Sequence, residues 1–222
     1  MDLGEHKELW LVRHGETPWL RRGLVQGHTD IGLNASGRRQ MELLGLRLRE
    51  SGVLFDGFWS SDLERAKESA LILQRFLLPP PRLQLDARLR EVDPGKFVGL
   101  REEEILRRYP EALRELIQNP WEGKRPQGES LAQVAARAGE FLADLPPGKH
   151  LVVTHEGWLK ALLVGPLGLG RGCLSKVFLL PSSLTKVLLP ERVLLSLGDV
   201  AHLERKGGVP GGRKQRRPAA WE

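Results

Sequence analysis

The stretch that most constrains the fold of this chain is residues 9–17, LWLVRHGET. Four apolar residues in a row between polar neighbours predict a short strand that is buried on both faces. The run stops at Arg13, His14 and Gly15. In open α/β sheets ligands bind at the carboxyl ends of such strands, where these residues offer a fixed positive charge, an imidazole and close access to the backbone. The stretch therefore predicts an anion site that suits phosphate.

A second apolar strand is expected at residues 150–154, HLVVT, and it is followed directly by His155, Glu156 and Gly157. If the two strands are neighbours in one parallel sheet, His14 and His155 point into one crevice although 141 positions separate them. A single histidine after a strand is more often structural. Two such histidines, each beside an arginine or a glycine, favour a functional site.

Strand and helix patterns alternate along the rest of the chain. Further strands are expected at residues 57–60, 83–85, 176–180, 184–189 and 193–197, and helices at 34–52, 61–76, 101–108, 111–118, 129–145 and 157–164. This alternation predicts an α/β fold: a three-layer α/β/α sandwich with a mostly parallel central sheet. With 222 residues, 41% of them hydrophobic, the chain is expected to form a single catalytic domain over residues 1–200.

The net charge of +6 is concentrated at the end of the chain. Residues 201–222 hold six basic and two acidic residues, whereas residues 1–200 hold 28 basic and 26 acidic ones. The glycines and prolines of this basic tail favour disorder, and such a tail binds polyanions weakly. A nucleic acid is therefore not expected as the main partner.

The sequence also limits location and metal chemistry. No apolar run approaches the roughly 18 residues of a membrane span, and the first residues lack the pattern of a secretory signal, so a cytoplasmic enzyme is expected. The single cysteine excludes an internal disulfide and a multi-cysteine zinc site. Abundant Arg, Leu, Glu and Pro favour a thermophile or a GC-rich genome. A homodimer is left open.

Several familiar catalytic motifs are absent from the sequence. A zinc-protease helix needs a second histidine where the chain has Leu159, and there is neither a phosphate-binding loop of the glycine-lysine-threonine kind nor a glycine-flanked nucleophilic serine. What remains is a phosphate site built from two arginines and two histidines. These are Arg13, His14, Arg65 and His155.

These groups predict phosphoryl transfer without a metal or cofactor. A phosphate monoester carries nearly two negative charges, which two guanidinium groups and one protonated imidazole can screen. Neutral His14 can then attack phosphorus through one ring nitrogen while a hydrogen bond fixes the other. Glu91, in a loop after a strand-like segment, is the best candidate proton donor for the leaving alkoxide, although a loop acid is more often only solvated.

The chain resembles the histidine phosphatase superfamily, also called the phosphoglycerate mutase-like family, over residues 9–197 in the right order. The matching segments are residues 11–17 with Trp19, Gln26, Gly27, Asp30, Leu33 and Gly37, then residues 60–66, 89–91, 126–130 and 152–155. The resemblance implies that His14 becomes phosphorylated, that Arg13, Arg65 and His155 form the phosphate pocket, and that Glu91 donates the proton. Gly15, Gln26 and Thr29 are expected to contact the substrate.

Two residues depart from the family pattern. Leu20 stands where an asparagine is usual, and Glu156 stands where a glycine is usual. We expect the Glu156 carboxylate to favour a protonated His155 and to repel acidic substrates. Trp19, Trp121 and Phe97 either border the pocket, where they would accept an apolar leaving group, or pack in the core.

Three functions remain. Only 34 residues lie between Glu91 and Pro126, too few for the insertion usual in the mutases, so we favour a phosphomonoesterase acting on a small phosphorylated metabolite. The alternative in the same class is a cofactor-dependent phosphoglycerate mutase, in which Arg107, Arg108 and Lys124 would hold a carboxylate. A non-catalytic regulator that binds polyanions is the alternative of another class.

Overall fold

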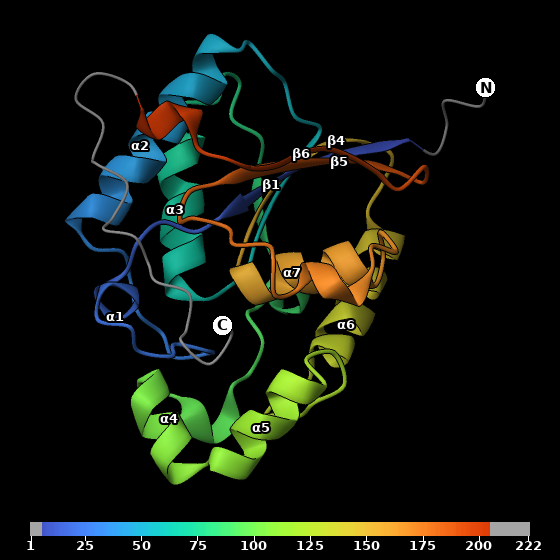
Figure 1. Cartoon of the computed structure of the whole chain (residues 1–222). Coiled ribbons are helices and arrows are strands. Elements are labelled where there is room, and N and C mark those ends of the chain that lie inside the picture. Colours follow the sequence, from blue (N-terminus) through green and yellow to red (C-terminus); the bar gives the residue numbers. More distant parts are fainter. Residues whose placement is uncertain (1–5, 205–222) are drawn as a thin grey trace.

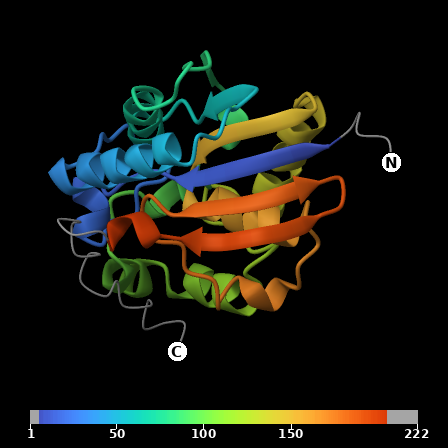
Figure 2. The same cartoon turned by 90° about the horizontal axis from the view of Figure 1, so that it is seen from above.

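The computed structural model describes residues 6–204, and within them a six-stranded sheet lies between layers of helices (Figure 1). The strands are β1 (Lys7–Arg13), β2 (Gly57–Ser60), β3 (Leu83–Leu85), β4 (Gly148–Thr154), β5 (Leu184–Leu189) and β6 (Val193–Asp199). Their order is β3-β2-β4-β1-β5-β6, which can be followed in Figure 2. Neighbours among β1 to β4 are parallel, whereas β5 and β6 are antiparallel to their neighbours. The expectation of a mostly parallel sheet is confirmed.

Helices cover both faces of this sheet (Figure 1). They are α1 (Pro18–Arg21), α2 (Ala35–Glu50), α3 (Glu64–Gln74), α4 (Glu102–Arg108), α5 (Pro110–Gln118), α6 (Leu131–Asp144) and α7 (Glu156–Val164). Successive side chains of β1 point to opposite faces: Leu9 and Leu11 pack in the cluster that contains α6 and α7, and Trp10 and Val12 in the cluster that contains α2 and α3. The first strand is thus buried on both sides, and the fold is a three-layer sandwich as predicted.

The register of β1 and β4 brings their ends together. Arg13 lies opposite Thr154, so His14 and His155 each follow the last residue of a paired parallel strand. Because the strands run in the same direction, both histidines leave the sheet at the same edge. The prediction that the two strands are neighbours is confirmed.

A small apolar cluster lies apart from the two main ones. It joins Phe97, which belongs to a short 3-10 helix (Gly95–Phe97), to Ile105 of α4 and to Leu113 and Leu116 of α5. In Figure 1 the α4–α5 pair projects below α7, beyond the edge of the sheet. The segment between Glu91 and α6 therefore forms a separate wall beside the strand ends.

Three local expectations need correction. Residues 176–180 form no strand, because their backbone joins no strand of the sheet, and the carbonyl of Leu179 accepts a hydrogen bond from the Arg13 side chain instead. No helix was expected between residues 17 and 34, but α1 forms there and begins where the Thr17 hydroxyl accepts the backbone N–H of Leu20 at 3.0 Å. The segment that was expected to be a disordered tail begins with an ordered 3-10 helix (Ala201–Leu203).

That 3-10 helix packs against α2, with Leu203 buried, so the folded body extends to residue 204. The basic part of the tail, residues 205–222, lies outside the described residues. Among residues 6–204, none of the helices has both the length and the apolar character that crossing a bilayer requires.

Candidate active site

His14 is held as a neutral imidazole whose Nε2 is unprotonated. Its Nδ1 lies 2.7 Å from the Gly15 carbonyl oxygen, to which it donates, and Arg65 Nε donates to His14 Nε2 at 3.2 Å. These two contacts assign the proton to Nδ1 and leave Nε2 unprotonated. Burial, reinforced by Arg65 and Arg13, lowers the pKa of His14 well below its usual value. The ring is therefore a ready nucleophile.

His155 faces His14 across the predicted crevice. The two ring centroids are 5.1 Å apart, and neither ring nitrogen of the buried His155 has a hydrogen-bond partner among residues 6–204. The residue caps the N-terminus of α7, where the helix dipole favours an anion. Burial first and Arg65 second lower the pKa of His155 well below its usual value. Glu156, which was expected to favour a protonated His155, is not among the causes of this shift.

Arg65, in the first turn of α3, is fully buried and fixed by backbone carbonyls. Its Nη2 donates to Gly27 at 2.6 Å and its Nη1 to Thr29 at 3.1 Å. Burial lowers its pKa to about 10, so the guanidinium is still charged at neutral pH. Thr29, which was expected to contact the substrate, holds Arg65 through its carbonyl.

Arg13 is buried and already has partners in the free site. Its Nη1 forms an ion pair with Glu156 Oε2 at 2.8 Å and also donates to the Leu179 carbonyl, whereas its Nε has no partner in the described part of the chain. The other Glu156 oxygen pairs with Lys160 at 2.9 Å. Burial opposes ionisation of Glu156, but Arg13 and Lys160 outweigh it and lower the pKa of this carboxyl. The carboxylate therefore lies between two cations and is not a bare negative charge.

The carboxyl of Glu91 lies against Gly157 in the first turn of α7. Its Oε1 accepts the Val92 backbone N–H at 2.9 Å, and a Cβ atom on Gly157 would lie only 2.3 Å from the same oxygen. A glycine at this position therefore makes room for the carboxyl. His28 Nε2, 2.7 Å from the Glu91 carbonyl oxygen, holds the backbone of the loop.

Arg137 of α6 holds the backbone of residues 88–91, and it was not identified from the sequence. Its guanidinium donates to three carbonyl oxygens, those of Arg88 at 2.7 Å, Arg90 at 2.6 Å and Glu91 at 2.9 Å. It also pairs with Glu129 at 3.1 Å. Glu129 belongs to a matching segment of the sequence, but Arg137 lies in the middle of a helix pattern where nothing distinguishes it from a surface arginine.

Gly15 and Gln26 have other neighbours than expected. A Cβ atom on Gly15 would lie 2.6 Å from the Gly37 carbonyl oxygen, so packing against α2 requires the glycine. The Oε1 atom of Gln26 accepts the Thr17 hydroxyl at 2.5 Å, and Gln26 also lines the adjoining cavity. Gly27 has φ +49°, and a side chain there would collide with Pro94 of the Glu91 loop.

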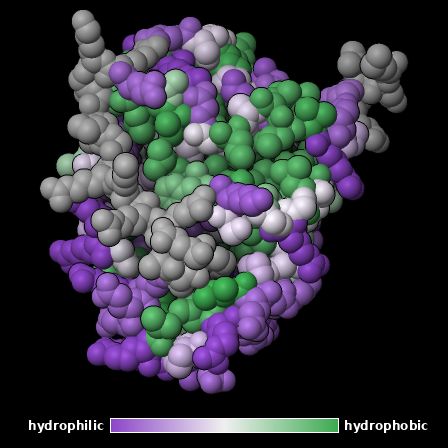
Figure 3. Space-filling model, in the orientation of Figure 1, coloured by the Kyte–Doolittle hydropathy of each residue, from purple (hydrophilic) through white to green (hydrophobic). Residues whose placement is uncertain are grey.

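A cavity of about 460 Å³ adjoins these groups. Its apolar lining is Leu20, Leu24, Val25, Val92, Pro94, Phe97, Ile105, Leu113, Leu116, Pro120, Leu131, Leu174, Val177 and Phe178. Its polar lining is Arg13, Gln26, Glu91, Arg125, Glu156, Lys160, Ser175 and Lys176. Figure 3 shows hydrophobic side chains at the surface between α7 and the α4–α5 pair.

The aromatic residues divide between the cavity and other places. Phe97 lines the cavity, as one of the two expectations had it, whereas Trp19 and Trp121 do not. Leu20 adds apolar surface where the family pattern has an amide. Arg125, which sequence reasoning missed, is also in the lining, and its Nη1 donates to the Glu129 carbonyl at 3.1 Å.

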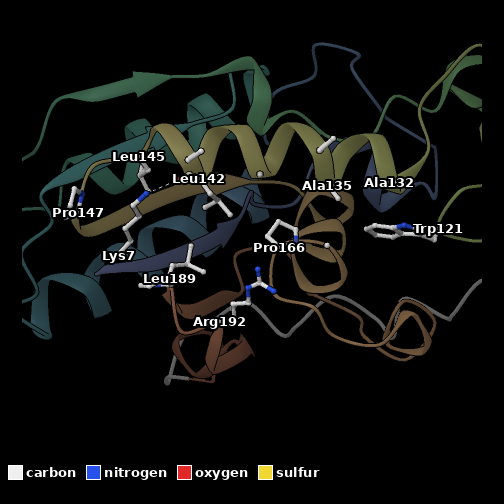
Figure 4. A pocket seen from close by; sticks show the side chains of 15 residues that line it. Lys7, Trp121, Ala132, Ala135, Leu142, Leu145, Pro147, Pro166, Leu189 and Arg192 are labelled. Atoms are coloured by element: carbon white, nitrogen blue, oxygen red, sulfur yellow. Dashed lines mark hydrogen bonds between the residues drawn. The ribbon is translucent and has the colours of Figure 1, made fainter. Parts of the chain in front are cut away.

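A second hollow, of about 1080 Å³, runs along α6 and contains none of the predicted site residues (Figure 4). Ala132, Ala135 and Leu142 form one side, and Leu189 and Arg192 of the β5–β6 hairpin lie on the other. Within residues 6–204 there is also no group of three or more His, Cys, Asp or Glu side chains arranged to hold a metal ion. The chemistry-bearing residues thus gather at the strand ends.

Comparisons with known proteins agree with this geometry. Residues 9–193 match the histidine phosphatase superfamily (branch 1). A protein named probable phosphoglycerate mutase GpmB from Citrobacter koseri is 32% identical, over 89% of this chain and 95% of its own length. The protein of the same name from Yersinia enterocolitica is 35% identical, again over 89% and 95%.

The similarity extends to solved structures. Phosphoserine phosphatase from Entamoeba histolytica has a TM-score of 0.77 and 25% identity, and the match covers 89% of this chain and 99% of that one. The two histidines at paired strand ends, the sheet order and the sequence match all lead to one assignment. This chain belongs to the histidine phosphatase superfamily.

Proposed function

We propose that this chain hydrolyses phosphate monoesters by way of a phosphohistidine at His14. The observation that carries the proposal is the protonation pattern of this imidazole, whose Nε2 lone pair lies beside the Arg65 guanidinium and opposite His155. A phosphoryl group placed there meets a nucleophile and fixed positive charge together. His155, with no partner among the described residues, is available to donate a hydrogen bond to a phosphate oxygen once the dianion raises its pKa.

In the first step His14 Nε2 attacks phosphorus, and the bond from phosphorus to the ester oxygen breaks as the P–N bond forms. Glu91 gives its proton to the leaving alkoxide, and the Gly15 carbonyl stabilises the proton that stays on Nδ1 of the phosphorylated ring. In the second step the Glu91 carboxylate takes a proton from water. The water oxygen then attacks phosphorus and the P–N bond breaks. This releases inorganic phosphate and restores His14 and Glu91.

The proposal is tested with para-nitrophenyl phosphate and a chelator. Wild-type protein is expected to release nitrophenolate at the same rate with and without the chelator, because the arginines supply the positive charge. His14→Ala is expected to lose at least about 10⁴-fold in kcat, the size typical for loss of a nucleophile. His6→Gln, on a histidine outside the site, serves as the control and keeps wild-type turnover.

The covalent step is tested by rapid quenching with a ³²P-labelled ester. Label that stays on the protein in alkali, leaves it in acid and is absent from His14→Ala supports the intermediate. Turnover with no such label at any quench time contradicts it. Absence of turnover in both proteins favours a non-catalytic binder.

Transfer to a second hydroxyl is the alternative, and it rests on the name carried by the curated relatives, probable phosphoglycerate mutase. Hydrolysis releases one inorganic phosphate for each ester consumed. A mutase instead interconverts the two monophosphoglycerates, is stimulated by the bisphosphate and releases little phosphate. Measuring both products in one reaction separates the two functions.

A further inference from the structure

Glu156 is an internal carboxylate at the junction of the phosphate site and the apolar cavity. One of its oxygens is 2.8 Å from Arg13 Nη1 and the other 2.9 Å from Lys160 Nζ. All three side chains line the cavity, and that of Glu156 is only 18% exposed. The arrangement is the one that a carboxylate on a bound substrate would adopt between two cations.

The other cations of the cavity do not replace this pair. Arg125 is already held by the Glu129 carbonyl at 3.1 Å and lies near the Glu129 carboxylate, and Lys176 is exposed at the cavity rim. A substrate that carries a carboxylate next to its phosphate therefore finds Arg13 and Lys160 already paired with the Glu156 carboxylate. To reach these cations it must displace Glu156 from a partly buried ion pair, which costs free energy.

The rest of the wall has the opposite preference. Leu24, Phe97, Leu116, Leu131 and Phe178 present apolar surface to the space beyond the phosphate site. An uncharged hydrocarbon group gains free energy by burial against such a surface, whereas a carboxylate loses hydration there. The charge arrangement and the wall thus favour the same kind of leaving group.

We propose that Glu156 is a specificity-determining residue which occupies the place of a substrate carboxylate, so that this site selects phosphate monoesters of uncharged, apolar alcohols. The inference rests on the proposed function, of which it names the substrate class. It also disfavours phosphoglycerates, because the pair that would hold their carboxylate already holds Glu156.

The test compares the binding of two phosphonates that cannot be hydrolysed, phenylphosphonate and 4-phosphonobenzoate. Calorimetric titration of the wild-type protein is expected to give a Kd at least about tenfold lower for phenylphosphonate. Glu156→Gln keeps the shape of the side chain and frees both cations. It is therefore expected to shift the ratio of the two Kd values at least about tenfold towards 4-phosphonobenzoate.

Two further variants make the result specific. Lys160→Gln leaves Glu156 with one cation fewer, so the preference for phenylphosphonate is expected to widen, and this variant tests the inference even if Glu156→Gln does not fold. Glu140→Gln removes the same charge from an exposed position on α6 and is expected to leave the ratio unchanged.

An unchanged ratio in folded Glu156→Gln, or equal binding of both phosphonates by the wild type, overturns the inference. Turnover of phenyl phosphate is measured separately on the same samples. If the wild type hydrolyses phenyl phosphate but Glu156→Gln leaves the ratio of the two Kd values unchanged, only the proposed substrate class is contradicted. If the wild type binds phenylphosphonate selectively but does not hydrolyse phenyl phosphate, the proposed hydrolysis is contradicted and the proposed specificity is supported.

Discussion

The phosphate site and the cavity beside it are built in different ways. Each reactive side chain of the phosphate site stands at the end of a regular element or on its first turn, and backbone carbonyls fix Arg65 and His14. The cavity is lined instead by short helices and irregular segments, with the small cluster of α4 and α5 behind them. The reaction thus depends on the sheet edge, and the choice of substrate depends mainly on segments outside the sheet.

The largest expected effect concerns the phosphate site, which we call the reaction half of the molecule; the cavity is the substrate half. Glu91→Gln removes the proton donor and is expected to lower kcat for an alkyl phosphate about 10³-fold, within the usual range for general acids. For para-nitrophenyl phosphate the loss is expected to be much smaller, because nitrophenolate leaves without a proton. Steady-state kinetics with both esters make the check, and equal losses would show that Glu91 does not donate the proton.

Arg137→Met tests whether the reaction half depends on residues behind the Glu91 loop. The variant removes one partner each from the carbonyl oxygens of Arg88, Arg90 and Glu91 and the only cation among residues 6–204 that is paired with the half-buried Glu129, and we expect unfolding to cost about 3 kcal/mol less than in the wild type. Denaturant titration measures this. Arg39→Met breaks an exposed ion pair and is expected to cost less than about 1 kcal/mol. Equal losses of unfolding free energy in the two variants would show that Arg137 contributes no more to stability than an exposed ion pair.

Phe178→Ala probes the substrate half alone. This cavity residue is 42% exposed, so its loss costs little stability, but we expect kcat/KM for phenyl phosphate to fall about tenfold. The value for methyl phosphate, which does not reach the wall, is expected to stay the same. Leu195→Ala, on an apolar residue of β6 that is 50% exposed, is the matched control. An equal fall of kcat/KM for phenyl phosphate and methyl phosphate would show that the cavity and the phosphate site do not act independently.

The smallest expected effect is a pH dependence of stability. Burial lowers the pKa of His14 in the folded protein, whereas in the unfolded chain it stays near 6.5, so the unfolded state binds more protons below that pH. Stability is then lost as the pH falls through 6.5, by less than about 1 kcal/mol for one histidine between pH 7 and pH 6. Unfolding titrations should show that wild type loses more than His14→Asn. Identical losses would indicate an ordinary imidazole.

The sequence predicted the reaction half far better than the substrate half. Strands that are buried on both faces leave a continuous apolar run, and the residue that ends such a run has a defined place at the sheet edge. His14 and His155 could therefore be placed close together without coordinates. Glu91 depended on the resemblance as much as on its loop.

Arg137, Arg125 and the ion pairs of Glu156 could not be predicted. Each depends on which helix face packs against a loop far away in the sequence, and periodicity does not record that. Residues 176–180 show the same limit: only Leu179 of this apolar run is buried and Phe178 is exposed, and local propensity does not distinguish such an irregular segment from a strand. Thr29 was assigned to the substrate because a sequence gives no sign that a residue acts through its carbonyl.

The register of β1 against β4 has a consequence for how such a protein can diversify. The distance between the two rings is set by the pairing of Arg13 with Thr154 and not by the length of chain between them. Insertions, deletions or exchanged segments in the loops of that interval leave the two rings where they are. Evolution and laboratory engineering can therefore recruit new leaving groups by replacing whole segments, whereas one residue added inside either strand would disassemble the catalyst.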